Sequence, residues 1–149
     1  MRSDKAGTTV GLTTFVRVAG DAEPASYRWD LAKAESVVAI LVAVRGANAD
    51  PIDDANGRAD SKRASIPAPD GVAHQDASLV LAIFGAARAT AITPPNGMTE
   101  IDEAASSSGR FKATLEIAAG SARDGAIDGL VAGASGRSAT VSHLIVIRP

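Results

Sequence analysis

The residues of this chain that are best suited to chemistry are aspartates gathered in one short stretch. The stretch "DPIDDANGRAD", residues 50–60, carries Asp50, Asp53, Asp54 and Asp60. Carboxylate oxygens are preferred ligands of Ca²⁺ in proteins, so several of them at close spacing form a candidate calcium site. This stretch is therefore the first place to test for a metal-binding motif.

The EF-hand calcium loop does not fit this stretch. When Asp54, Asn56 and Gly57 are aligned with positions three, five and six of that loop, position one falls on Ile52 and position twelve on Arg63. Both positions require acidic residues. We favour the alternative, a solvated loop whose aspartate and asparagine side chains cap turns, and we expect no metal or cofactor site.

Other constellations that could support catalysis are weak. The histidines His74 and His143 are isolated and the chain has no cysteine, so a zinc site is not expected. No G-x-S-x-G nucleophile elbow is present, and "GASGRS" (133–138) lacks the spacing of a phosphate-binding loop. We expect His74 to be exposed in a polar turn and His143 to be packed at the start of a strand.

Glycosidases use two carboxylates at a controlled separation. The candidates in this chain are Glu100, Asp102, Glu103 and Glu116. In "RFKATLEIA" (110–118), strict alternation places Leu115 and Ile117 on an apolar face and sends Glu116 outward. These acids are therefore interpreted as surface charge. No residue is predicted to be catalytic, and we do not expect an enzyme.

Carbohydrate-binding modules stack sugars on exposed aromatic rings, which makes the few rings of this chain informative. In "SYRWDL" (26–31), Tyr27, Trp29 and Leu31 alternate with polar residues, which predicts that Trp29 belongs to the core. Phe15 falls on the otherwise polar face of its own segment, so it could be exposed or meet a partner. The sequence offers no clear sugar platform.

The elements that must position these residues are expected to form one domain over residues 1–149, because this length suits a single core. The net charge is −2 without a block of like charge, so nucleic-acid binding is not expected. The longest apolar run, Val37 to Val44, is far shorter than the roughly 20 residues of a membrane helix, so membrane insertion is not expected either.

That apolar run, within "ESVVAILVAVRGAN" (35–48), predicts a strand buried on both faces. It is continuous, rich in β-branched residues, and stops at Gly46. The alternative is a helix from Asp30 to Arg45 with Asp30 as its N-cap, and a helical turn near 32–35 is allowed. The many valines and the absence of an amphipathic stripe favour the strand.

Further strands are predicted by alternation at 9–18, 26–31 and 110–118, and by continuous apolar runs at 78–85 and 143–149. Turn-forming segments such as "IPAPDG" and "TPPNG" separate them. The polar tract 48–71 is expected to be mostly loop, with a short edge strand near 62–66. The predicted fold class is all-β: an antiparallel, jelly-roll-like β-sandwich.

Several of these segments, in their order along the chain, resemble a group of phage and prophage virion structural proteins, namely tail-fibre, minor-tail or head-fibre and decoration-like β-sandwich modules. The shared features are a strand ending in R-V-A (15–19), an E-P-x-x-Y-x-W segment (23–29), an apolar strand ending in R-G and followed by P-I-D (36–53), a P-P-x-G-M-T hairpin (94–99), an A-A-G turn (118–120) and a last strand ending in proline (137–149). The resemblance covers nearly the whole chain, and its motifs are structural.

The resemblance implies a non-enzymatic virion protein that acts in particle assembly, stabilisation or contact with a host surface. Its implied partners are other capsid or tail proteins, and a homo-oligomer is expected. Members of the group usually carry further N-terminal strands before the stretch that resembles "RSDKAGTT" (2–9). We therefore expect either a shortened module or a neighbouring chain that supplies strands. The alternative function is a carbohydrate-binding module for a host-surface glycan.

Overall fold

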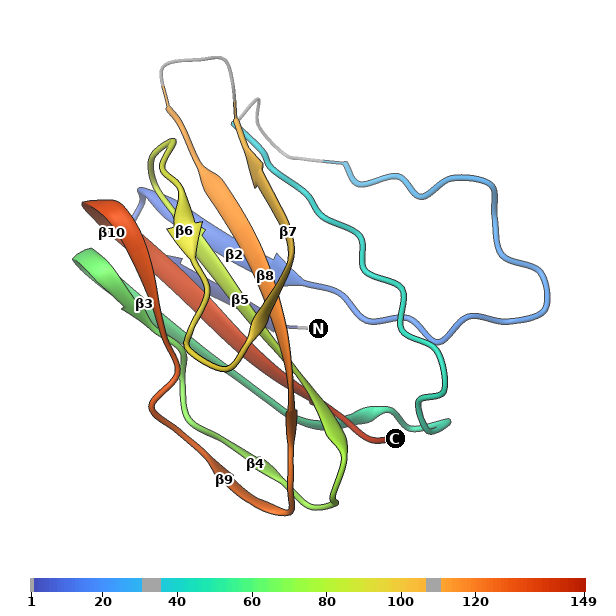
Figure 1. Ribbon diagram of the computed structural model, residues 1–149. Helices are drawn as coiled ribbons and strands as arrows, with labels where there is room; N and C mark the ends of the chain where they lie inside the picture. Colours follow the sequence, from blue (N-terminus) through green and yellow to red (C-terminus); the bar gives the residue numbers. More distant parts are fainter. Residues whose placement is uncertain (1, 31–35, 107–110) are drawn as a thin grey trace.

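The computed structural model describes residues 2–30, 36–106 and 111–149, and these residues form antiparallel strands without a helix (Figure 1). The strands are β1 (Arg2–Ala6), β2 (Val10–Thr14), β3 (Ile52–Pro67), β4 (Gly71–Ala73), β5 (Ser78–Ala86), β6 (Ile92–Thr93), β7 (Thr99–Ala105), β8 (Thr114–Ala122), β9 (Gly125–Ile127) and β10 (Val131–Ile147). The predicted all-β, antiparallel fold class is confirmed, and its layers are consistent with a β-sandwich.

The main sheet has the strand order β3-β10-β5-β8-β7, and β6 pairs with the start of β10. Strand β5 is paired along its length with β10 on one side and β8 on the other. Its Leu81 and Ile83 are buried on one face and its Val80, Ala82 and Phe84 on the other. The apolar runs at 78–85 and 143–149 are therefore central strands as predicted, because both faces of the sheet are covered there.

The first face of the main sheet, that of Leu81 and Ile83, is covered by two separate pieces of chain. The hairpin β1–β2 contributes Leu12 and Ala6 to the same apolar cluster. Beside this cluster, residues 36–47 supply half-buried side chains, among them Ile40 and Val42. The covering layer on this face thus combines one regular hairpin with one segment that pairs with no strand among the described residues.

The second face, that of Val80 and Phe84, is covered by the main sheet's own longest strands. Ile66 near the end of β3 and Ala132 near the start of β10 pack into the cluster around Phe84, together with Ile92 of β6. The pairing of β10 with β3 changes register between residues 133 and 138. Such an irregularity bends a strand, which lets one strand take part in both layers.

The predicted buried strand at residues 37–44 is wrong. Residues 36–45 are assigned to neither strand nor helix, so the alternative helix is wrong over these residues too; the turn allowed near 32–35 lies outside the described residues. Val38, Ile40 and Val42 are half-buried, whereas Leu41 is 78% exposed. Within the described part of the chain no strand pairs with this segment and nothing covers its outer side. We call residues 36–44 the apolar strip.

Residues 15–30 form a long loop that leaves the end of β2 and reaches away from the strands (Figure 1). Every residue of this loop is exposed, so the predicted strand at 26–31 is wrong, and the strand predicted at 9–18 exists only as β2. Trp29, expected in the core, is 54% exposed, and Leu31 lies outside the described residues. We call residues 15–30 the aromatic loop.

The polar tract 48–71 is mostly strand, which corrects the prediction of a loop with a short edge strand near 62–66. Strand β3 runs from Ile52 to Pro67 and pairs with β10 along most of its length. It lies at the edge of the main sheet. An edge strand needs few apolar side chains, which explains why its composition resembles that of a loop.

Candidate functional site

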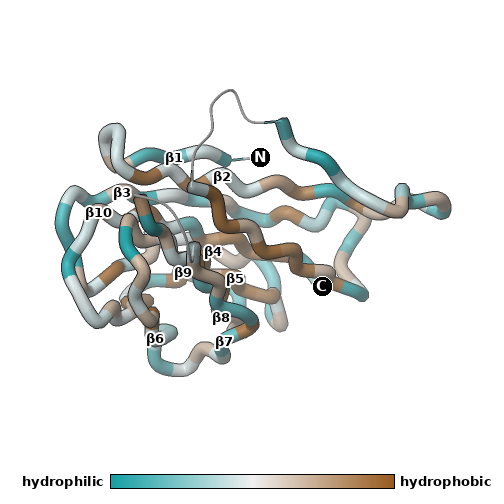
Figure 2. Tube along the Cα trace, turned by 90° about the horizontal axis from the view of Figure 1, so that it is seen from above, coloured by the Kyte–Doolittle hydropathy of each residue, from teal (hydrophilic) through white to brown (hydrophobic). Residues whose placement is uncertain are grey.

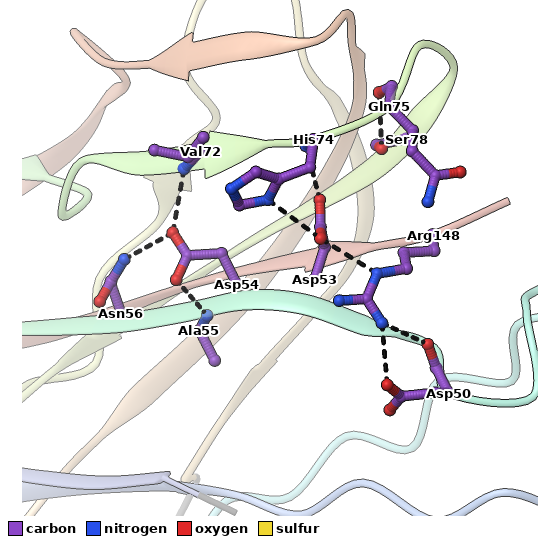
Figure 3. Close-up of polar contacts among 10 residues, drawn as sticks. All are labelled: Asp50, Asp53, Asp54, Ala55, Asn56, Val72, His74, Gln75, Ser78 and Arg148. Carbon is purple, nitrogen blue, oxygen red and sulfur yellow. Dashed lines mark hydrogen bonds and ion pairs between the residues drawn. The ribbon is translucent and has the colours of Figure 1, made fainter.

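The candidate site with the densest polar chemistry is the aspartate stretch, which the structure places at the start of β3 (Figure 3). The Asp53 side chain is only 1% exposed. Its Oδ2 accepts a hydrogen bond from the His74 backbone N–H at 2.7 Å, and its Oδ1 lies 3.0 Å from Nε of Arg148 and 3.1 Å from Nδ1 of His74. The hydrogen bond from the His74 backbone, followed by that from Arg148, holds the pKa of Asp53 below its usual range.

Both carboxylate oxygens of Asp54, the next residue of β3, accept hydrogen bonds. Its Oδ2 accepts hydrogen bonds from the Val72 backbone N–H at 2.9 Å and from Nδ2 of Asn56 at 2.8 Å. Its Oδ1 accepts from the Ala55 backbone N–H at 2.8 Å. The pairing of β3 with β10 is irregular at this point, between Val146–Asp54 and Ile147–Ile52, and both carboxylates reach the β4 segment, Asp54 at Val72 and Asp53 at His74.

The two outer aspartates of the stretch form ion pairs. Asp50 accepts from a terminal nitrogen of Arg148 at 2.9 Å. Asp60 lies 2.8 Å from Nε of Arg58 and 3.2 Å from a terminal nitrogen of Arg63, and the hydrogen bond from Arg58 lowers the pKa of Asp60. Asp50 and Asp53 thus share Arg148, whereas Asp54 and Asp60 have partners of their own.

The aspartate stretch connects neighbouring segments through hydrogen bonds and ion pairs. It attaches β4 and the C-terminal end of β10 to β3, through contacts that are 18, 21 and 95 residues apart in the sequence. The solvated-loop interpretation is wrong for Asp53, which belongs to β3 and has an enclosed side chain. Among the described residues, no group of three or more histidine, aspartate or glutamate side chains is arranged to hold a metal ion.

A second polar group lies between the hairpin β1–β2 and β10. The imidazole of His143 has no exposed surface, its Nδ1 is 2.7 Å from the Thr14 hydroxyl, and its Nε2 is 3.1 Å from Oδ2 of Asp4. A hydroxyl, an imidazole and a carboxylate in contact resemble a nucleophile and its base. The imidazole is enclosed, so within this group it joins the hairpin to β10. Burial also lowers the pKa of His143, although Asp4 opposes this change.

This group attaches the hairpin to the main sheet. Nε of Arg2 lies 2.7 Å from Oδ2 of Asp4, and a terminal nitrogen of Arg2 donates to the Ala55 carbonyl at 3.2 Å. Oδ2 of Asp4 lies at ion-pair distance from both Arg2 Nε and His143 Nε2. Neither contact has the geometry of a hydrogen bond. A Cβ at Gly57 would come within 2.2 Å of both Arg2 and Asp4, so only glycine leaves room for them.

The carboxylate candidates for glycoside hydrolysis lie on β7 and β8. Glu103 and Glu116 face each other across the β7–β8 ladder, and Glu103 accepts a hydrogen bond from the Ile92 backbone N–H at 2.6 Å. Glu116 was predicted to point outward, which is wrong: it is fully buried beside Phe84, its partner on β5. Strand β8 lies between two other strands and is covered on both faces, so alternation there does not separate core from solvent.

Glu116 is an unusual buried acid, because neither of its carboxylate oxygens has a hydrogen-bond partner. Burial, with smaller contributions from Glu100 and Glu103, raises the pKa of Glu116 to about 7. Below about pH 7 the carboxyl group is mostly protonated, which avoids the cost of a buried charge. Glu116 has no exposed surface, whereas Glu103 is half-buried.

The exposed aromatic rings form a third group, in the aromatic loop. The ring centroid of Trp29 lies 6.4 Å from that of Phe15 and 6.2 Å from that of Tyr27. The guanidinium carbon of Arg17 is 5.7 Å from the centroid of Tyr27, and Tyr27 donates a hydrogen bond from its hydroxyl to Glu23. Phe15 is exposed, which was one of its two expected placements. The alternation that assigned Trp29 to the core missed this cluster, because exposure depends on the neighbouring layer.

The pKa of Glu116 predicts a dependence of stability on pH. The unfolded chain ionises this carboxyl near 4.5 and the folded chain near 7, so folding stability falls as pH rises through this window. We expect Glu116→Gln to raise the free energy of unfolding by about 1–2 kcal/mol at pH 8 and to change it little at pH 4. Urea titrations at both pH values measure this. The exposed Asp102→Asn is the control, and equal effects of the two substitutions would contradict the assignment.

Comparisons of the chain with protein-family models, with curated proteins and with solved structures find no match. In the part of the chain that the structure describes, no helix has the length and apolar character needed to cross a membrane.

Proposed function

We propose that this protein is a non-enzymatic structural component of a phage virion, a capsid-decoration, head-fibre or tail-fibre module that works by associating with further copies of itself and with other virion proteins. The observation that supports assembly most strongly is the incomplete layer over the first face of the main sheet. The family resemblance supplies the biological setting, namely particle assembly, stabilisation or contact with a host surface.

The apolar strip has the properties of a strand that lacks a neighbour. Its side chains alternate between half-buried and exposed, as expected for extended chain against a core. Among the described residues, no backbone–backbone hydrogen bond involves residues 36–44. The first such bond after β2 is donated by the Asn48 N–H to the Arg148 carbonyl at 3.2 Å. Backbone N–H and C=O groups without partners are a template for pairing with another chain.

The composition of the apolar strip favours association as well. Edge strands are usually protected by charged residues or proline. Residues 36–44 contain neither, and Figure 2 shows them as a continuous brown path that runs toward the C-terminus. Twelve large hydrophobic side chains are exposed in the described residues, and eight of them belong to the apolar strip or the aromatic loop: Phe15, Val16, Val18, Tyr27, Trp29, Val37, Leu41 and Val44. Exposed apolar side chains that gather in two segments of the chain are typical of interaction sites.

The arrangement of the polar groups supports a structural role. Asp53 and Asp54 of the aspartate stretch form hydrogen bonds that connect β3 to the β4 segment. The imidazole of His143 and the carboxylate of Glu116 are buried. A catalytic group must reach its substrate. These groups therefore favour scaffolding over chemistry.

The test of this proposal is a charge placed in the apolar strip. We expect the purified chain to form a homo-oligomer and to be present in purified virions. Leu41→Lys should weaken self-association by about 30- to 100-fold, because an unpaired ammonium would be buried in the interface. Light scattering coupled to size exclusion measures the mass in solution, and mass spectrometry of particles measures incorporation.

Val131→Lys is the matched control for Leu41→Lys, because Val131 is an exposed apolar residue outside the apolar strip and the aromatic loop. This control should assemble normally. A wild-type chain that stays monomeric at all concentrations and is missing from particles would rule the proposal out.

A second candidate function, carbohydrate binding, is favoured by the cluster of Phe15, Tyr27 and Trp29. Three exposed rings in contact offer the apolar faces on which sugars stack, and Arg17 and Glu23 beside them offer polar groups. On this interpretation the ligand is a host-surface glycan.

The carbohydrate candidate predicts that Trp29→Ala weakens glycan binding by roughly threefold to tenfold, the size of one aromatic contact. Glycan-array measurements with and without calcium test this, and Val18→Ala in the same loop is the control. If no glycan binds, or if both variants bind equally well, the carbohydrate candidate is contradicted.

A further inference from the structure

A hollow beside the β1–β2 turn is not used by any of the roles above. It has a volume of about 500 Å³ and lies where the β1–β2 turn, the β5–β6 connection, the residues before β8 and the irregular part of β10 meet. Its polar lining consists of Arg88, Lys112 and Arg137 with the hydroxyl residues Thr9 and Ser138. The three cations come from the β5–β6 connection, the residues before β8, and the irregular part of β10.

Among the described residues, no carboxylate balances the charge of this hollow. None of its lining residues is acidic, and within the described part of the chain Arg88, Lys112 and Arg137 form no ion pair. Most other described arginines pair with a carboxylate: Arg2, Arg17, Arg28, Arg58, Arg63 and Arg148. Like charges held together repel one another, so an anion in this hollow would gain from all three cations at once.

The backbone that carries Arg88 is held firmly in place. The hydroxyl of Thr114, a buried residue of β8, donates to the Arg88 carbonyl at 2.9 Å and accepts from the Thr90 backbone N–H at 3.1 Å. The Ala87 backbone N–H donates to the Ala139 carbonyl of β10 at 2.9 Å. Arg88 is thus fixed relative to both β8 and β10, the elements next to the other two cations.

The side chain of Arg88 also depends on a glycine. A Cβ at Gly136 would lie 2.1 Å from a terminal nitrogen of Arg88 and 2.6 Å from its guanidinium carbon. The guanidinium therefore lies against the backbone of β10 beside Arg137. A methyl group at Gly136 would move the guanidinium aside without removing its charge.

We infer that this hollow binds an oxyanion, a sulfate, phosphate or carboxylate group carried either by a free ion or by an acidic saccharide. Guanidinium groups form paired hydrogen bonds with such groups, and the ammonium of Lys112 adds a point charge. The hydroxyls of Thr9 and Ser138 complete a polar lining suited to a hydrated anion. This inference stands independently of the assembly proposed above.

The test uses the full chain and three probes: inorganic sulfate, inorganic phosphate and a heparin-derived tetrasaccharide. Each is titrated at constant ionic strength against chloride, and NMR shifts of backbone amides near residues 88, 112 and 137 measure binding. We expect saturable shifts, and the double variant Arg88→Gln/Arg137→Gln should bind at least about tenfold more weakly. Tighter binding of the saccharide than of sulfate identifies a glycan source, and equal affinities identify the free ion.

Two variants separate a built site from general attraction to positive charge. Arg123→Gln removes an exposed arginine outside the hollow and should leave binding unchanged. Gly136→Ala keeps every charge but displaces the guanidinium of Arg88, so it should weaken binding. Shifts that fail to saturate with all three probes, or a loss of binding by Arg123→Gln equal to that of the double variant, would overturn the inference.

Discussion

The structure depends on covering both faces of three adjacent strands, β10, β5 and β8. Their inner residues are apolar on the two sides of the sheet, so each face must be shielded from water. The second face is shielded by the bent ends of β3 and β10 themselves. The first face is shielded by the hairpin β1–β2 and by the apolar strip. The inner side chains of the strip pack on the sheet, whereas its outer side chains, in the described part of the chain, are exposed.

The buried polar residues connect the covering segments to the main sheet. Asp53 and Asp54 attach β4 and the end of β10 to β3, and His143 with Asp4 and Arg2 attaches the hairpin to the main sheet. Each group neutralises buried polar atoms while it connects distant parts of the chain. The acidic stretch that suggested a calcium site in the sequence is therefore explained by packing.

The sequence predicted the features that depend on local composition. The continuous apolar run at 78–85 is the central strand β5, and the all-β, antiparallel class follows from alternation and turn residues. The turn in "TPPNG" is present, with a Met98 to Pro95 backbone hydrogen bond of 3.1 Å and Gly97 at a φ of +83°. These features could be predicted because neighbouring residues determine them.

Features that depend on a distant partner could not be predicted. The apolar strip has the composition of a buried strand, but burial requires a neighbour, and composition does not reveal whether one is present. Trp29 alternates like a core residue and is nevertheless exposed. The contact of Asp53 with Arg148 joins residues 95 apart, and the hollow lined by Arg88, Lys112 and Arg137 combines three separate segments, so neither leaves a pattern in the sequence.

The central claim is that the apolar strip, which has no strand partner among the described residues, becomes a strand when it pairs with another chain. Hydrogen exchange of the amides of residues 36–44 tests it most directly, measured over concentrations that take the protein from dissociated to assembled. The account predicts fast exchange in the dissociated chain and strong protection after assembly. Protection that is already complete in the dissociated chain, or exchange that stays fast in the assembly, would contradict it.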